Sequence, residues 1–160
     1  MTYRTAGGEA LTDLILHTFR ANGDLISEGD RIAGEFGQSS ARWQVLGALD
    51  AGAETVPGIA RAMGLARQSV QRTVDLLQAD GLVEYRSNPA HRRSNLVAMT
   101  RKGRRIYEAI SVEQVEWVNR VARDMKVRVQ DIRTALEVLR SLGAVLGENG
   151  ERGGRTDRTQ

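Results

Sequence analysis

The sequence predicts a mainly α-helical protein with a small β-wing. Three observations support this prediction. Apolar residues recur at helical spacing along most of the 160 residues. Between Thr55 and Gly103, two short helical stretches precede two β-prone runs and the start of a further helix. A polar, arginine-bearing turn joins the two β-prone runs. This order is the layout of a winged helix-turn-helix, flanked here by long N- and C-terminal helices.

The N-terminal part is predicted to be a short tail followed by two helices. Residues 1–8 are polar and glycine-rich, as flexible tails are. Residues 9–36 carry an apolar stripe that three glycines interrupt. Each glycine lowers the stability of the helix by up to ~1 kcal/mol relative to alanine, so packing against other elements must stabilise this helix. A second helix is predicted near residues 40–49, with Ser39 or Ser40 as its N-cap.

The next two helices have the features of a helix-turn-helix. Helices that cross steeply need a small residue at their contact, which Ala60 supplies. The turn favours a residue without a side chain, and Gly64 stands there. Apolar residues are expected to close the underside: Ile59, Met63, Leu65, Val70 and Val74.

The second of these helices, predicted over residues 67–79, has two faces. At about 100° per residue, Val70, Thr73, Val74 and Leu77 share a core-facing arc. The opposite arc carries Gln68, Gln71 and Arg72, with Ser69 and Asp75 at its edges. Glutamine can pair bidentately with adenine, and arginine with guanine or phosphate. Arg67 lies off this arc and is better placed for a phosphate. A merely solvated polar face is the alternative interpretation.

A β-hairpin is predicted after this helix. Residues 82–86 alternate as a half-buried strand does and end at Arg86, and residues 95–99 form a second β-prone run. The turn between them carries Arg92 and Arg93. Arginine at a hairpin tip can enter a narrow minor groove, where the negative potential is enhanced. Arginine that serves only solubility is the alternative.

Positive charge is concentrated on this motif. Residues 61–105 hold ten basic and three acidic side chains, a net charge of +7. The rest of the chain therefore carries −4, because the whole chain carries +3. Such a positive patch supplies the salt-sensitive, phosphate-binding part of affinity for double-stranded DNA.

Two more long helices are predicted, over residues 101–125 and 129–146, and residues 147–160 read as a second flexible tail. One small winged domain cannot bury the apolar stripes of all the long helices. We therefore expect the terminal helices to pack against a second copy in a twofold homodimer. An intramolecular bundle is the alternative.

Composition excludes several function classes. The chain has no cysteine, so a disulfide framework, a thiolate metal site and a thiol-based oxidation sensor are excluded. The two histidines, His17 and His91, fit no metal-ligand spacing, and no catalytic or phosphate-loop motif is present. We expect no enzyme activity and no cofactor. Without an 18-residue apolar run or a signal-peptide pattern, we expect a soluble cytoplasmic protein that makes no membrane contact.

The motif residues resemble one family, the MarR (multiple antibiotic resistance regulator) transcription factors. The similarity spans about residues 10–146 and is most specific from the hairpin into Thr100 and Gly103. Matching segments are Arg42-Trp43-Gln44-Val45-Leu46, Ile59-Ala60, Met63-Gly64-Leu65, Val74-Asp75-Leu76-Leu77, Gly81-Leu82-Val83-Glu84, Pro89-Ala90-His91-Arg92-Arg93 and Met99-Thr100-Arg101-Lys102-Gly103. Three features depart from the family pattern, and one of them is the unusual Pro57-Gly58 opening of the first motif helix. His91 stands where the family carries an aspartate that binds the wing arginine, here Arg93, and Ala66 replaces the usual hydroxyl cap.

The resemblance implies a homodimer joined through residues 9–36 and 101–146, with residues 37–100 forming the DNA-binding part. It implies a sequence-specific regulator, more often a repressor than an activator, that recognises a pseudo-palindromic operator. The DNA-binding residues would be Arg67, Gln68, Ser69, Gln71, Arg72, Arg86, Arg92 and Arg93. Family members often hold a small aromatic or anionic effector beside the dimerising helices, for which His17, Arg42 and Trp43 are the candidates.

The sequence leaves purely structural roles open for these three residues, with Trp43 in the core, Arg42 in an ion pair and His17 on a helix face without a function. Two other functions are also open for the whole chain. One is a winged-helix module that binds proteins. The other is an architectural protein that binds DNA without sequence preference.

Overall fold

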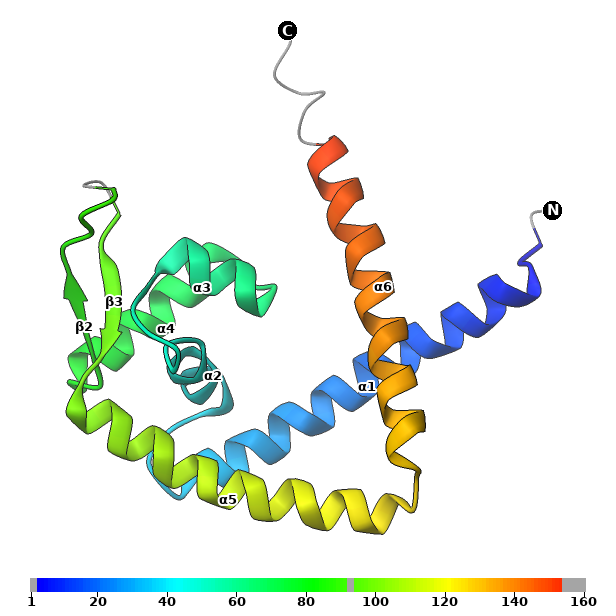
Figure 1. Ribbon diagram of the computed structural model, residues 1–160, viewed down its shortest axis with the longest axis horizontal. Coiled ribbons are helices and arrows are strands. Elements are labelled where there is room, and N and C mark those ends of the chain that lie inside the picture. Colours follow the sequence, from blue (N-terminus) through cyan, green and yellow to red (C-terminus); the bar gives the residue numbers. More distant parts are fainter. Residues whose placement is uncertain (1–2, 92–93, 154–160) are drawn as a thin grey trace, which may run out of the picture. The chain divides into compact units, whose positions relative to one another are not determined.

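The computed structural model describes residues 3–91 and 94–153 (Figure 1). Six helices and three strands occur within these residues. They are α1 (Ala6–Gly34), α2 (Ser40–Ala48), β1 (Glu54–Thr55), α3 (Val56–Met63), α4 (Arg67–Ala79), β2 (Val83–Arg86), β3 (Leu96–Met99), α5 (Arg101–Met125) and α6 (Val129–Gly153). The chain divides into two compact units, Met1–Val115 and Glu116–Gln160. The predicted fold class, mainly α with a small β-wing, is confirmed.

The core of the first unit lies where α2, α3 and α4 meet the hairpin. Its buried side chains come from elements far apart in the sequence, which fixes these elements to one another. They include Val45, Leu46, Leu49, Val56, Ile59, Ala60, Val70, Val74, Leu77, Leu82, Val83 and Val97. The prediction that Ile59, Val70 and Val74 close the underside is therefore confirmed, and Met63 packs partly buried against the same core. Leu65 was wrongly assigned to the underside, since it is 46% exposed. It follows the left-handed Gly64, which turns the chain away from the core.

The three strands form one antiparallel sheet in the order β1-β3-β2. In the hairpin, Val83 pairs with Met99 and Arg86 with Leu96. The second run begins one residue later than predicted. Strand β1, which pairs Glu54 with Val97, was not predicted because two residues give no alternating pattern. It ties the start of α3 to the hairpin, and the hairpin lies beside α4 (Figure 1).

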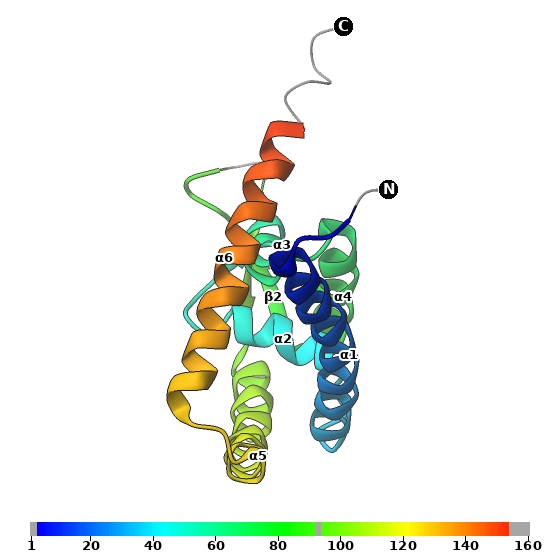
Figure 2. The same cartoon turned by 90° about the vertical axis from the view of Figure 1, so that its right-hand side faces the viewer.

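Helices α1 and α2 are joined closely. Gly29 of α1 is buried against Ser40, where an added Cβ would lie 2.7 Å from the Ser40 hydroxyl oxygen. The Asp30 carboxylate accepts a hydrogen bond of 2.6 Å from the Ser40 backbone N–H. Ser39 caps α2 by accepting from the Arg42 N–H, which settles the choice between the two predicted caps. Both views show α2 beside the last turns of α1 (Figures 1 and 2).

The terminal helices differ in length from the prediction. Helix α1 begins at Ala6 because Thr5 caps it, with its hydroxyl 3.1 Å from the Gly8 N–H, so the predicted tail of residues 1–8 is partly helical. The same helix ends at Gly34, two residues early. Helix α6 continues to Gly153, through seven residues of the predicted tail. Once a helix is nucleated, each added residue gains a hydrogen bond, so polar residues can extend it.

Candidate nucleic-acid interface

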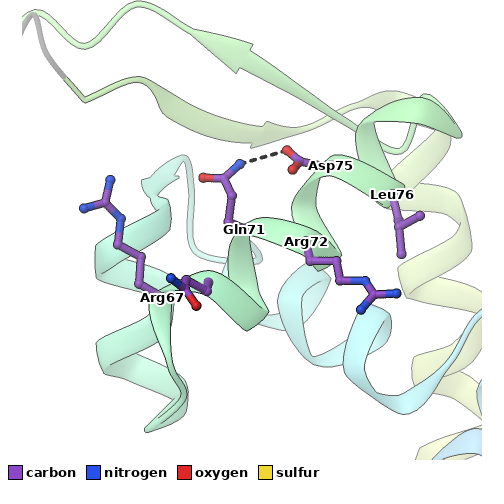
Figure 3. Close-up of a pocket in the computed structure, with 6 residues that line it drawn as sticks. Arg67, Gln71, Arg72, Asp75 and Leu76 are labelled. Atoms are coloured by element: carbon purple, nitrogen blue, oxygen red, sulfur yellow. Dashed lines mark hydrogen bonds between the residues drawn. The ribbon is translucent and has the colours of Figure 1, made fainter.

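Helix α4 presents the predicted two faces. Val70, Val74 and Leu77 are at most 1% exposed and anchor one face in the core. Thr73, predicted for that face, is half-buried, and its hydroxyl donates to the Ser69 carbonyl oxygen at 3.1 Å. The other face borders an open hollow of about 660 Å³ (Figure 3). This hollow is lined by Arg67, Gln68, Gln71, Arg72, Asp75 and Leu76.

The local geometry holds α4 in this orientation. Gly64 ends α3 in the left-handed conformation, with φ of 63°, as the turn prediction required. Thr55 caps the start of α3 by accepting from the Gly58 N–H at 3.1 Å. Ala66 makes no side-chain cap, as predicted, so no N-cap side chain accepts from the N–H groups of the first turn of α4. The positive end of the helix dipole is thus left without a side-chain acceptor beside Arg67.

Gln71 is more constrained than the sequence indicated. Its Nε2 donates to the Asp75 carboxylate at 2.8 Å and to the Tyr85 hydroxyl at 2.7 Å. The Tyr85 hydroxyl in turn lies 3.4 Å from the same Asp75 oxygen. Figure 3 shows the Gln71 amide directed toward the hairpin and Asp75, while Arg72 extends on another side of the helix.

Tyr85 was missed as a site residue, because the sequence marked it only as part of a strand. It shares the inward side of β2 with Val83, two residues before it, so the strand period was the available signal. Burial raises the pKa of the Tyr85 hydroxyl, and the nearby Asp75 charge raises it further, although the Gln71 hydrogen bond opposes this. The hydroxyl therefore stays protonated at neutral pH and can donate.

The wing contributes Arg86, the predicted DNA contact at the end of β2. Its guanidinium is paired with Glu84, with a nitrogen–oxygen distance of 2.7 Å, and both side chains are at least half exposed. An exposed pair of this kind is weak and can exchange for a phosphate. Arg92 and Arg93, the predicted hairpin-tip contacts, lie outside the described residues.

Two short-range hydrogen bonds lie next to the hairpin tip. The Asn88 side-chain oxygen accepts from the Ala90 N–H at 3.0 Å, and the His91 carbonyl accepts from the Ser94 N–H at 3.0 Å. His91, which stands at the family's aspartate position, is exposed. A smaller hollow of about 230 Å³ lies between the hairpin and helices α3 and α4. Its lining includes Val56, Pro57, Arg67, Gln71, Tyr85, Ser94 and Asn95.

The three effector candidates have different surroundings. Arg42 donates to the Asp80 carboxylate and, at 3.2 Å, to the Leu76 carbonyl oxygen, which ties α2 to the end of α4. The Arg42 hydrogen bond and charge lower the pKa of the Asp80 carboxyl. Trp43 is half-buried, whereas His17 is exposed and has Nδ1 2.8 Å from the Asp13 carbonyl oxygen. Within the described residues, no hydrogen bond or ion pair joins His17 to Arg42 or Trp43.

Residues 3–91 and 94–153, which the structure describes, offer neither a metal site nor a membrane span. No group of three histidine, aspartate or glutamate side chains in these ranges is placed to hold a metal ion. Among the helices of the described part, none is long and apolar enough to cross a membrane.

Comparison with known proteins identifies the family. The model of the MarR family matches residues 36–94. An uncharacterized protein of Mycobacterium tuberculosis is 39% identical over 114 residues, covering 71% of this chain and 80% of that protein. The transcriptional activatory protein BadR of Rhodopseudomonas palustris is 28% identical over 111 residues, covering 67% of this chain and 63% of BadR.

The fold agrees with this identification. The crystal structure of CouR from Rhodococcus jostii RHA1, bound to p-coumaroyl-CoA, superposes with a TM-score of 0.72 at 23% identity, covering 81% of this chain and 91% of CouR. At that identity the likeness concerns the fold alone. MarR-family regulators are DNA-binding transcription factors without enzyme activity. From its sequence relatives, the matched family model and its winged-helix fold, the chain belongs to the MarR family of transcriptional regulators.

Proposed function

We propose that this protein is a homodimeric repressor that binds a pseudo-palindromic operator through α4 and the wing of each subunit. The observation that carries the proposal is the outward face of α4. It combines exposed Gln68, Ser69 and Arg72 on a helix whose opposite face is anchored in the core. Amide and guanidinium groups on a rigid helix are suited to reading base edges in the major groove.

The contacts are divided between two tasks in this proposal. Arg72, with Gln68 and Gln71, reads base edges. Arg67, Ser69 and Arg86 hold phosphates, and Arg92 and Arg93 enter the adjacent minor groove. Phosphate contacts set the register of the protein on the duplex, whereas base contacts carry the sequence information.

The homodimer is supported by apolar side chains that the terminal helices leave exposed. They occur on α1 (Leu11, Leu16, Phe19, Leu25 and Ile26), on α5 (Val112, Val115, Val118 and Met125) and on α6 (Ile132, Leu136, Val138, Leu139, Val145 and Leu146). Exposed apolar area of this extent is typical of an interface. A twofold dimer would place the two α4 helices about 34–36 Å apart, one turn of duplex, and so favour an inverted repeat. Light scattering should give twice the chain mass of 17.6 kDa, and a 17.6 kDa particle at micromolar concentration would contradict the dimer.

A selection experiment tests sequence-specific binding. The protein is incubated with randomised duplexes, and the bound fraction is sequenced over several rounds. Enrichment of an inverted repeat, followed by protection of that repeat in a footprint, supports the operator model. Binding without enrichment or footprint would instead indicate an architectural protein, and a dimer without salt-dependent duplex binding would indicate a protein-interaction module.

Repression is tested with the selected operator placed over a promoter that drives a reporter. Expression should fall when the protein is supplied, because a dimer bound there blocks access of the polymerase. BadR is an activatory protein by name. Increased expression would therefore assign the same role to this chain and contradict repression.

Arg72→Ala is expected to weaken operator binding by ~1–3 kcal/mol and to relax the preference at particular base pairs, because a bidentate base contact is lost. Gln71→Ala should relax the preference at a different base pair. Arg61→Ala removes one positive charge from α3 in the same unit and serves as the control, for which base preferences should stay unchanged. A loss of affinity that is equal for all duplexes would show that Arg72 contacts phosphate instead.

We also propose that a small aromatic or anionic effector releases the DNA, with Arg42 and Trp43 on α2 and His17 on α1 as candidate contacts. CouR, whose fold is similar, has been crystallised with p-coumaroyl-CoA. The test is titration of the protein–operator complex with p-coumaroyl-CoA and with p-coumarate. A contact between Arg42 and the effector would be supported if the effector no longer releases the operator from Arg42→Ala but still releases it from Asp80→Asn. Equal loss in both variants would show that the Arg42–Asp80 pair only holds α2 against α4.

A further inference from the structure

The cluster of Gln71, Asp75 and Tyr85 joins α4 to the wing next to the base-reading face. The two residues of α4 are one helical turn apart, and Tyr85 reaches them from β2. A carboxylate only accepts hydrogen bonds, so the 2.8 Å contact with Asp75 identifies the contacting Gln71 atom as the amide nitrogen. The second donor of that nitrogen is directed to the Tyr85 oxygen at 2.7 Å.

This arrangement accounts for both N–H groups of the Gln71 amide. A primary amide has two donors and one carbonyl oxygen. Asp75 accepts a hydrogen bond from one N–H and Tyr85 accepts one from the other. The Tyr85 hydroxyl itself donates to the same Asp75 oxygen at 3.4 Å. The carbonyl oxygen, Oε1, is the polar atom of the side chain that these three contacts leave uncommitted.

We propose that Tyr85 and Asp75 hold Gln71 so that it presents only its amide oxygen to the DNA, which makes it select a base with an exocyclic amine. In the major groove, adenine offers such a donor at N6 and cytosine at N4, whereas guanine and thymine offer acceptors there. Gln71 then accepts adenine and cytosine at its base pair, and Tyr85 is a positioning residue of the specificity. This inference rests on the proposed DNA-reading role of α4.

The same contacts disfavour the bidentate adenine pair that glutamine side chains otherwise form. That pair needs the amide oxygen on N6 and one amide N–H on N7. One N–H of Gln71 would have to leave either the charged Asp75 or the half-buried Tyr85 hydroxyl. Hydrogen bonds to charged groups are among the stronger ones, and a half-buried hydroxyl left without its partner is disfavoured. The intramolecular contacts therefore compete directly with recognition of N7.

The test measures the adenine-to-cytosine preference at one operator position. Gln71→Ala first locates that position, as the single base pair at which preference is lost. The wild-type dimer should bind the adenine and cytosine operators within about threefold of each other. The double variant Tyr85→Phe with Asp75→Ala frees both N–H groups, so the bidentate pair becomes possible. Adenine should then be preferred by about 5- to 150-fold, the range of one bidentate base contact.

The two single variants keep the inference testable if the double variant does not fold. Only the N–H on the same side of the planar amide as its oxygen can complete the bidentate pair, and either Tyr85 or Asp75 holds it. One of the two single variants must therefore raise the ratio. Removal of the Asp75 charge can increase affinity for every duplex, but it cannot by itself change a ratio between two duplexes.

Tyr107→Phe is the matched control. It removes a hydroxyl from a half-buried tyrosine of α5 in the same unit, outside α4 and the wing, and should leave the ratio unchanged. An unchanged ratio in both single variants would overturn the inference, as would a wild-type preference for adenine above tenfold. Failure of the underlying function has a different signature, since the wild-type protein would then enrich no sequence at all.

Discussion

Gly103→Ala is expected to unfold the DNA-binding unit at temperatures at which the wild type is stable. Gly103 is buried in the first turn of α5. A Cβ added there would lie 2.1 Å from the carbonyl oxygen of Leu82 and 2.9 Å from the Met99 Cγ. The Leu82 oxygen cannot move aside freely, because it accepts the Thr100 N–H at 3.0 Å. Overpacking costs about 1–3 kcal/mol, and a backbone clash of this depth should reach or exceed the upper figure.

The measurement is thermal unfolding followed by circular dichroism. A loss of 3 kcal/mol in the free energy of unfolding corresponds to a fall in Tm of roughly 10 °C for a unit of this size. Gly34→Ala is the matched control, because nothing lies within 4 Å of its added Cβ at the end of α1, and it should leave Tm unchanged or slightly raised. If the two variants had the same Tm, the close packing of α5 on the hairpin would be wrong.

This contact explains why the segment from the hairpin into α5 requires particular residues at Thr100 and Gly103. The Thr100 hydroxyl donates to the Gly81 carbonyl oxygen at 2.8 Å and accepts from the Gly103 N–H at 3.0 Å, so it caps α5 while holding the turn before β2. Gly103 lets the helix approach close enough for both bonds. The position of the wing beside α4 therefore depends on the threonine and glycine together.

Most of the fold could be predicted from the sequence because local rules decide it. Helix α4 runs from Arg67 to Ala79 as predicted, since its apolar residues keep one period from end to end. Gly64 marks the turn because a φ of 63° favours glycine. The two-residue β1 lies below the length at which a period can be recognised. Leu65 was placed wrongly because the prediction used only its apolar character. It did not include the change of chain direction at Gly64.

The site could be predicted only as a list of side chains, because hydrogen-bond partners far apart in the chain leave no local pattern. Gln71 was assigned to an outward arc, yet Tyr85, fourteen residues later, takes one of its donors. Arg42 was assigned either to an effector or to an ion pair, but its ion-pair partner, Asp80, stands thirty-eight residues later and could not be named. For Gln71 the helical period gave the face of α4 but not what the side chain meets there, and for Arg42 the sequence indicated no partner.

Operator binding should weaken steeply with salt, by a factor of about 10³–10⁵ between 50 and 200 mM, if the dimer neutralises six to ten phosphates. The expectation follows from the ten basic side chains of residues 61–105, of which α4 and β2 contribute exposed Arg67, Arg72 and Arg86. Each neutralised phosphate releases condensed counterions, which gives a slope of about −0.9 in log affinity against log salt. Fluorescence anisotropy over a series of salt concentrations measures the slope.

Arg67→Ala assigns part of that slope to one residue. Arg67 is the first residue of α4, at the uncapped positive end of the helix, and lines both hollows described above. A phosphate there would gain from the guanidinium and from the helix dipole together. Because a homodimer carries the residue twice, the slope should become shallower by about 1.8, while base preferences stay the same. Arg140→Ala removes the same charge from α6 and should leave the slope unchanged, provided that the mass of the dimer is preserved. A changed base preference in Arg67→Ala would instead place Arg67 on a base edge, and an unchanged slope would remove it from the interface.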